Sequence, residues 1–320
     1  MTDDAPCSTD GHPGIPPTRS AHRTGDLARE DLGVADFDAY LSRLGVARRT
    51  PAVDALFELQ RAHVEHVPYE TLWIAEGTPR TIDPDDSVEA INRGHGGYCF
   101  QLNGAFSSLL ASLGYDVTLH AGAVHGSAGP TIEGLHNHLV LLVHGLPTSD
   151  HPSGTWYVDA GLGDALHEPL PLAPGTYQQG ALTFGLAPCE HPEYDWQWRH
   201  DPKGAFFGMS FRDRPARLRD FASQHAHLSH SPESLFVNNL ILMRRDASGS
   251  TGIANVLLTE NTEHGSTRRL VTDRDEWIDL VQHRFLRSLD DVSAAEIDRI
   301  WALLMVRYEQ FKSAHPSATT

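Results

Sequence analysis

The most informative segment of this chain is Arg93-Gly-His-Gly-Gly-Tyr-Cys-Phe-Gln-Leu-Asn103. Apolar residues then recur at helical spacing and stop at a glycine: Leu102, Phe106, Leu109, Leu113 and Gly114. This spacing predicts a helix that begins at or next to Cys99. Glycines before a helix let the backbone approach other groups closely, and the positive end of a helix favours a thiolate. Taken alone, the pattern fits either an activated nucleophile or a buried, inert cysteine.

A base and an orienting carboxylate lie downstream, at the ends of two predicted strands. His138 leads into the apolar run Leu139–Val143, and Asp159 closes a second run that begins at Thr155. If these strands are adjacent and antiparallel, the imidazole and the carboxylate lie side by side. Cysteine, histidine and aspartate together can form an activated nucleophile. Because the chain has 20 histidines, a lone histidine at a strand edge could equally be a polar rim residue.

Other kinds of site have weaker support. His136-x-His138 offers two zinc ligands, but neither Cys-x-x-Cys nor His-Glu-x-x-His accompanies it, so no metal site is expected. A Walker A loop, a Rossmann fingerprint and a Gly-x-Ser-x-Gly elbow are also missing from the sequence. Twenty-five basic residues against 42 acidic ones give a net charge of −17, the opposite of the balance usual in nucleic-acid-binding proteins.

The composition favours a soluble, cytoplasmic protein that binds neither membrane nor nucleic acid. The longest apolar run, Trp301–Val306, is far too short to span a bilayer. The N-terminus lacks the apolar region of a secretory signal, and three cysteines cannot form a disulfide framework. Residues 1–32 contain few large apolar side chains, so we expect them to be a disordered tail in which Cys7 has no role.

Helical patterns precede residue 115, and strand patterns follow it. Thr50-Pro51 is typical of a helix N-cap followed by proline at the first helical position. Short apolar runs predict strands from about residue 116 onward, including Phe236–Arg244 and Ile253–Thr259. Ser293 to Glu296 is a capping box that predicts a final helix. The expected order is therefore helices, then strands, then a mixed unit.

Five segments resemble motifs of the arylamine N-acetyltransferase family, and they occur in the family's order. Gly96–Asn103 is similar to its Arg-Gly-Gly-Tyr/Trp-Cys-Phe-Glu/Gln-x-Asn motif. His66–Leu72 is similar to its His-x-x-x-Pro-Phe-Glu-Asn-Leu segment, and His138–Val143 to its histidine strand. Val158–Gly163 is similar to its Val-Asp-x-Gly-Phe-Gly turn, and Ser229–Phe236 to its Ser-Thr-His-Pro-x-Ser-x-Phe stretch. The resemblance covers about residues 35 to 290.

The resemblance implies an α+β fold whose core is like that of cysteine proteases and transglutaminases. It implies a helical domain with the nucleophile at residues 33–115 and a β-barrel-like domain with the histidine and aspartate at residues 116–225. An α/β lid domain follows at residues 226–320. It also implies ping-pong transfer of an acetyl group from acetyl-CoA, through a cysteine thioester, to a small arylamine or hydrazine. No metal takes part in this chemistry.

Mapped residue by residue, the resemblance assigns the nucleophile to Cys99, the base to His138 and the orienting carboxylate to Asp159. His138 is preferred to His136 because it directly precedes the strand, as the family histidine does. Three further residues are expected to bind substrate, Asn137, Leu162 and Phe236, and the resemblance places Leu162 and Phe236 at the acceptor pocket.

Two positions depart from the family motifs. His95 stands where the family usually has arginine, and Leu162 replaces the phenylalanine of Gly-Phe-Gly. An aliphatic side chain has no ring face on which an arylamine could stack, so the amine preference is expected to differ. Amide synthesis on a thioester-bound natural product and hydrolysis by water are alternative activities of the same three residues. A catalytically idle binding protein is a further alternative, against which the intact Cys, His and Asp set argues.

Overall fold

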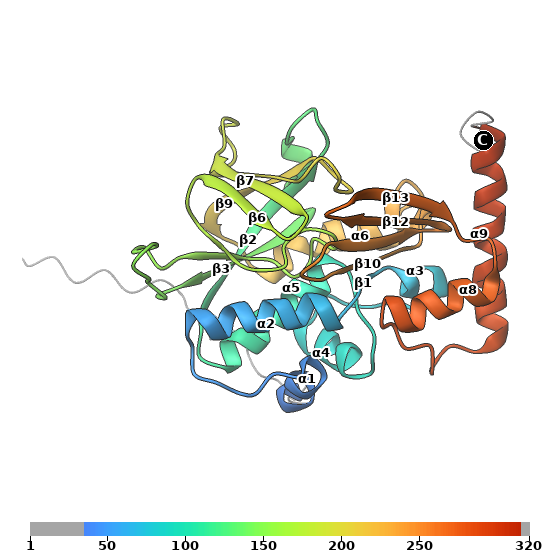
Figure 1. Cartoon of the computed structure of the whole chain (residues 1–320), viewed down its shortest axis with the longest axis horizontal. Helices are drawn as coiled ribbons and strands as arrows, with labels where there is room; N and C mark the ends of the chain where they lie inside the picture. Colours follow the sequence, from blue (N-terminus) through green and yellow to red (C-terminus); the bar gives the residue numbers. More distant parts are fainter. Residues whose placement is uncertain (1–34, 315–320) are drawn as a thin grey trace, which may run out of the picture.

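The computed structural model describes residues 35–314, which form two antiparallel sheets with helices packed around them (Figure 1). The tail predicted at residues 1–32, with Cys7, lies outside the described residues. No helix within 35–314 is long and apolar enough to cross a membrane.

The first part of the chain is helical, as predicted. It contains five helices, α1 (Phe37–Leu44), α2 (Val53–His66), α3 (Leu72–Glu76), α4 (Pro84–Asn92) and α5 (Cys99–Ser112). The predicted Thr50 cap of α2 is wrong. Ala52 has extended backbone angles and no side-chain cap bond, so the helix begins only at Val53.

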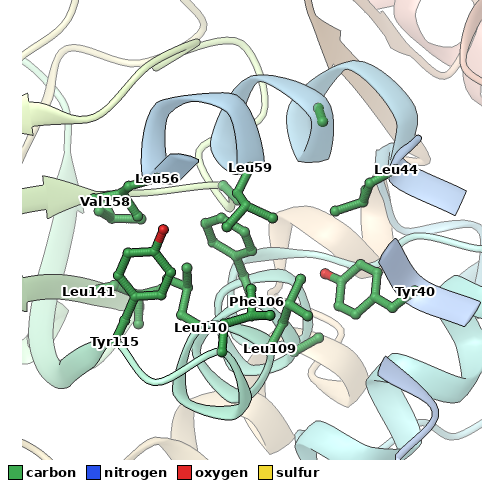
Figure 2. Close-up of a cluster of buried hydrophobic side chains, with 14 of the residues drawn as sticks. Tyr40, Leu44, Leu56, Leu59, Phe106, Leu109, Leu110, Tyr115, Leu141 and Val158 are labelled. Atoms are coloured by element: carbon green, nitrogen blue, oxygen red, sulfur yellow. The ribbon is translucent and has the colours of Figure 1, made fainter. Parts of the chain in front are cut away.

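A hydrophobic core holds α5 between α2 and the larger sheet. Figure 2 shows apolar side chains of α2, α5 and two strands meeting in this core: Leu56, Leu59, Phe106, Leu109, Leu110, Leu141 and Val158. Each fully buried side chain of this size contributes roughly 1.5–3 kcal/mol to folding. The packing therefore fixes α5, and with it Cys99, against the sheet.

The larger sheet has eight strands in the order β5-β4-β3-β2-β9-β8-β7-β6, and every pairing is antiparallel. The strands are β2 (Asp116–His125), β3 (His138–His144), β4 (Trp156–Val158), β5 (Leu170–Pro171), β6 (Gly175–Gln179), β7 (Leu182–Pro188), β8 (Trp196–Arg199) and β9 (Gly208–Pro215). Buried side chains fill its interior, among them Val140, Leu142, Tyr157, Trp198 and Phe211. This barrel-like sheet matches the expected α+β fold.

The smaller sheet combines one strand from the helical segment with four strands from the last third of the chain. Its order is β1 (Tyr69–Glu70), β10 (Ile241–Arg245), β11 (Ser250–Ala254), β12 (Leu257–Thr262) and β13 (Gly265–Leu270). β1 comes from the helical segment, and its Tyr69 also forms a β-bridge with Gly97, so the segment before Cys99 is tied directly to this sheet. The three-domain division stays a prediction.

The remaining helices follow the strands of the larger sheet in sequence, and the last two of them pack on the smaller sheet. They are α6 (Ala222–His230), α7 (Leu235–Asn238), α8 (Arg274–Asp279) and α9 (Ala294–Ala314), with short 3-10 turns at Ile132–Gly134 and Leu218–Phe221 and a π-helical turn at Leu280–Arg284. Ser293 Oγ accepts from Glu296 N at 3.2 Å before α9, which is one of the two bonds of the predicted capping box, and the Glu296 carboxylate accepts from Arg299 Nε.

Two of the predicted strands differ in the structure. Phe236 lies in α7, because the Ser234 hydroxyl accepts its N–H at 3.1 Å and starts a helical turn. The run Ile253–Thr259 is divided between β11 and β12 by a turn at Asn255, whose φ is +54°. Asparagine adopts this left-handed conformation more readily than most residues, which allows the hairpin.

Candidate active site

Cys99 is the first residue of α5, and its side chain is only 4% exposed. A tight turn precedes it: a Cβ atom on Gly96 would lie 1.8 Å from the Pro68 carbonyl oxygen, so only glycine fits there. Tyr98 N donates to Gln101 Oε1 at 3.1 Å and satisfies one backbone group at the helix start. The thiol therefore lies at the positive end of a 14-residue helix, as predicted.

The strands β3 and β4 bring His138 and Asp159 together. They pair antiparallel, with Leu141 opposite Val158, so the first residue of β3 lies beside the residue that follows β4. His138 Nε2 is 2.7 Å from Asp159 Oδ2. The Cys99 thiol lies close enough to the same imidazole to help raise its pKa, and it donates to the Asn137 carbonyl oxygen at 3.7 Å. The structure thus places the three predicted side chains in contact.

The protonation of His138 is set by these contacts. Burial alone lowers the pKa of an imidazole, because it disfavours the charged form. At His138 the negative charge of Asp159, the hydrogen bond that the imidazole donates to Asp159 and the nearby Cys99 outweigh burial and raise the pKa to about 10. The protonated imidazole is therefore favoured at neutral pH.

The carboxylate of Asp159 is buried and accepts four hydrogen bonds. Oδ2 accepts from His138 at 2.7 Å and from the Tyr157 hydroxyl at 2.9 Å. Oδ1 accepts from Asn103 Nδ2 at 2.8 Å and from Gly161 N at 2.9 Å. These donors compensate the cost of burying a charge, which is large for an isolated carboxylate.

The residues that hold Asp159 are not part of the set predicted from the sequence. Asn103 lies four residues after Cys99, one turn along the same face of α5, and this spacing was an available signal. Gln60 on α2 accepts the Asp159 N–H at 3.3 Å. It is 99 residues away in sequence, so no local pattern links the two.

Comparison with known proteins identifies the family. A family model described as N-acetyltransferase matches residues 52–293. The chain belongs to the arylamine N-acetyltransferase family.

Relatives of this acetyltransferase agree in sequence and in structure. It is 27% identical to the arylamine N-acetyltransferase / N-hydroxyarylamine O-acetyltransferase of Salmonella typhimurium, over 88% of this chain and 97% of that one. It is 31% identical to proansamycin X synthase of Amycolatopsis mediterranei, over 50% of this chain and 61% of that one. The solved structure of Mycobacterium marinum arylamine N-acetyltransferase in complex with CoA has a TM-score of 0.73 and 26% identity, covering 84% of this chain and 98% of that chain.

The three residues predicted to bind substrate in this acetyltransferase have different surroundings. The Asn137 amide is bound to the main chain of Val124, at 2.7 Å through Oδ1 and 3.0 Å through Nδ2, while its carbonyl oxygen lies 3.7 Å from the Cys99 thiol. Leu162 is buried in the core of the larger sheet. Phe236 is half-buried, with its ring centroid 5.4 Å from that of Tyr98. Their part in acceptor binding stays a prediction.

A cavity of about 250 Å³ lies near the turn that follows Asp159. Gly161 packs against the nucleophile, since a Cβ atom there would lie 2.8 Å from Cys99 Cα. Gly163, with φ +66°, packs against Met243, which lines the cavity. The lining includes two cationic side chains and one acidic one, Lys203, Arg268 and Asp164.

The histidine pair at the start of β3 has no metal-binding surroundings. Within residues 35–314, no three His, Cys, Asp or Glu side chains are placed to hold a metal ion. His136 instead meets the ring of Phe221 edge-on, with centroids 5.5 Å apart.

Proposed function

We propose that this acetyltransferase moves an acetyl group from acetyl-CoA to an arylamine or hydrazine through a thioester on Cys99. The observation that carries this proposal is the buried contact of Cys99, His138 and Asp159, in which one charged imidazole lies between a thiol and a carboxylate. A thiolate is a far better nucleophile than a thiol, and a neighbouring imidazolium stabilises it.

In the first half-reaction, the Cys99 thiolate attacks the acetyl carbonyl carbon of acetyl-CoA. The carbon–sulfur bond to CoA then breaks, and the proton on His138 Nδ1 passes to the departing CoA thiolate. Backbone N–H groups at the start of α5 support the developing oxyanion, because they form the positive end of the helix. The products are acetyl-Cys99, free CoA and a neutral imidazole.

In the second half-reaction, the amine nitrogen attacks the thioester carbonyl carbon. Neutral His138 accepts the proton that the nitrogen loses, and the bond between the acetyl carbon and Cys99 Sγ breaks. This releases the amide and restores the thiolate and imidazolium. Asp159 keeps its charge throughout and holds the ring in one tautomer.

The cavity beside Gly163 is the proposed binding site for the donor, acetyl-CoA. Its Lys203 and Arg268 can interact with phosphate groups, and Met243 in its lining packs against Gly163 of the turn that follows Asp159. The solved Mycobacterium marinum relative holds CoA. On the acceptor side, Leu162 in place of the motif's phenylalanine favours amines that do not depend on ring stacking.

A second candidate is amide synthesis from a carrier-bound acyl thioester. The similarity to proansamycin X synthase favours it, at 31% identity over half of this chain. The thioester on Cys99 would form in the same way, and the two candidates differ in the donor.

Intact-protein and peptide mass spectrometry after mixing with acetyl-CoA tests the proposal. We expect one acetyl group on Cys99, which is lost when an arylamine is added. Cys99→Ser should fold but form no adduct, because a hydroxyl has a far higher pKa than a thiol; Cys189→Ser is the matched control that keeps the adduct. An adduct in Cys99→Ser would contradict the proposal. Labelling only by a longer acyl thioester would favour the second candidate.

A further inference from the structure

Arg80 contacts the segment before the nucleophile from two directions, although no motif includes it. Its Nη1 donates to the Gly96 carbonyl oxygen at 3.1 Å, and its Nη2 lies 2.9 Å from His95 Nδ1. Its own carbonyl oxygen is 2.8 Å from His225 Nε2, and Nδ1 of that ring is 2.5 Å from the Tyr98 hydroxyl. One residue thus connects to three of the four positions that precede Cys99.

The contact between Arg80 and His95 requires a neutral imidazole. A guanidinium has only donors, so His95 Nδ1 accepts and carries no proton. Nε2 then carries the proton and faces Asp291 Oδ1 at 3.2 Å. Burial, with the charges of Arg287 and Arg80, lowers the pKa of His95 despite Asp291 and Glu70 nearby. The shift and the contact geometry therefore both favour the neutral imidazole that accepts from the guanidinium.

The same guanidinium partners a buried carboxylate. Glu70 is fully buried, and its Oε1 lies 3.4 Å from Arg80 Nη1 and 3.5 Å from Arg287 Nε. Its main-chain N–H donates to the Gly97 carbonyl oxygen at 2.8 Å. Arg80, Glu70 and the glycine turn therefore form one hydrogen-bonded unit. The Arg80 side chain is only 14% exposed, so water competes little for these bonds.

We propose that Arg80 is a positioning residue for Cys99. Its guanidinium, held by His95 and Glu70, fixes the Gly96 carbonyl and so sets where the thiol lies relative to His138. At His95 the family motif has arginine, and here a guanidinium reaches that place from Arg80 instead. The inference rests on the proposed function of Cys99 as the nucleophile.

The decisive variant is Arg80→Met, which keeps an apolar stem and removes every donor. We expect the single-turnover rate of Cys99 acetylation to fall roughly 10- to 100-fold, because an ångström of misplacement at reacting atoms costs about that much. Arg93→Met is the matched control. Arg93 and Arg80 both line a cavity of about 610 Å³, but Arg93 is 67% exposed and pairs with Glu89 at the surface. Its acetylation rate should stay unchanged.

Rescue separates positioning from general stability. Adding His95→Arg to Arg80→Met returns a guanidinium to the motif position, and we expect it to recover most of the acetylation rate. Arg80→Lys keeps a positive charge beside the buried Glu70 carboxylate, so we expect this variant to fold. Its ammonium donates from one point and lacks the planar fork that reaches Gly96 and His95 from two nitrogens, so a rate below that of the wild type is expected.

The outcomes distinguish this inference from the proposed function. A wild-type enzyme without an acetyl adduct contradicts the proposed function. If the wild type acetylates Cys99 and folded Arg80→Met or Arg80→Lys does so at the wild-type rate, the positioning role is overturned. A reduced rate in folded Arg80→Lys, with rescue of Arg80→Met by His95→Arg, confirms it.

Discussion

Two buried histidines of this acetyltransferase, His138 and His63, have pKa values shifted in opposite directions. His138 is 1% exposed and hydrogen-bonded to Asp159, whose charge outweighs burial and raises the pKa to about 10. His63 is also fully buried, in the core beside α5, and burial lowers its pKa to about 3. Burial is common to both sites, and the partner differs.

The surroundings of His63 explain its neutral state. Its ring packs against the rings of Tyr40 and Phe106, with centroids 5.9 and 4.9 Å away. Neither ring nitrogen has a hydrogen-bond partner in the part of the chain that the structure describes. The charge of Arg43 lowers the pKa of His63 further. A carboxylate partner therefore turns a buried imidazole from a neutral core residue into a charged one.

Removing that partner should have the largest effect. In Asp159→Asn the size of the side chain is kept and the charge is lost, so the pKa of His138 should fall and Cys99 should regain its proton. We expect single-turnover acetylation to drop by on the order of 10³- to 10⁴-fold, the scale seen when a triad carboxylate is neutralised. Stopped-flow or quench-flow measurement with acetyl-CoA checks this.

Asp201→Asn is the control for Asp159→Asn. Asp201 is also buried, but its carboxylate accepts from the backbone of Thr183 and Lys203. Its substitution should affect stability more than acetylation. A different role for Asp159 follows if Asp159→Asn lowers only the thermal midpoint: the carboxylate would then serve the turn through its bond to Gly161 N.

Substitution of His63 should have a smaller effect, and this effect should be on the free energy of unfolding rather than on the acetylation rate. Its folded-state pKa of about 3 lies below the unfolded value of about 6.5, so stability is lost as the pH falls between these values. By pH 5 the loss is about 2 kcal/mol for this group. His63→Leu should flatten the acid dependence of urea unfolding by this amount, whereas substitution of the exposed His264 should not. An unchanged acid dependence of urea unfolding in His63→Leu would show that His63 does not contribute to it.

The sequence allows the nucleophile, base and carboxylate to be predicted because each lies at the end of a regular element. Glycines and helical spacing locate Cys99, and apolar runs locate His138 and Asp159. The order of the motifs supplies the α+β fold. These are local patterns, which can be recognised in a single sequence.

The groups that complete the site could not be predicted in the same way. Gln60 reaches Asp159 across 99 positions, and His225 reaches Tyr98 across 127. Such contacts depend on how α2, α5 and α6 pack, which neither periodicity nor composition encodes. Asn103 is the exception, because its spacing of four from Cys99 was visible on one helix face.

The pH dependence of iodoacetamide labelling at Cys99 tests the central claim most directly. Only the thiolate reacts, and an ordinary thiol has a pKa of about 8.5. If His138 and Asp159 hold Cys99 as a thiolate, its labelling rate should stay nearly constant well below that value and exceed the rate at Cys189. A Cys99 rate that rises only above about pH 8, in parallel with that of Cys189, would contradict the claim.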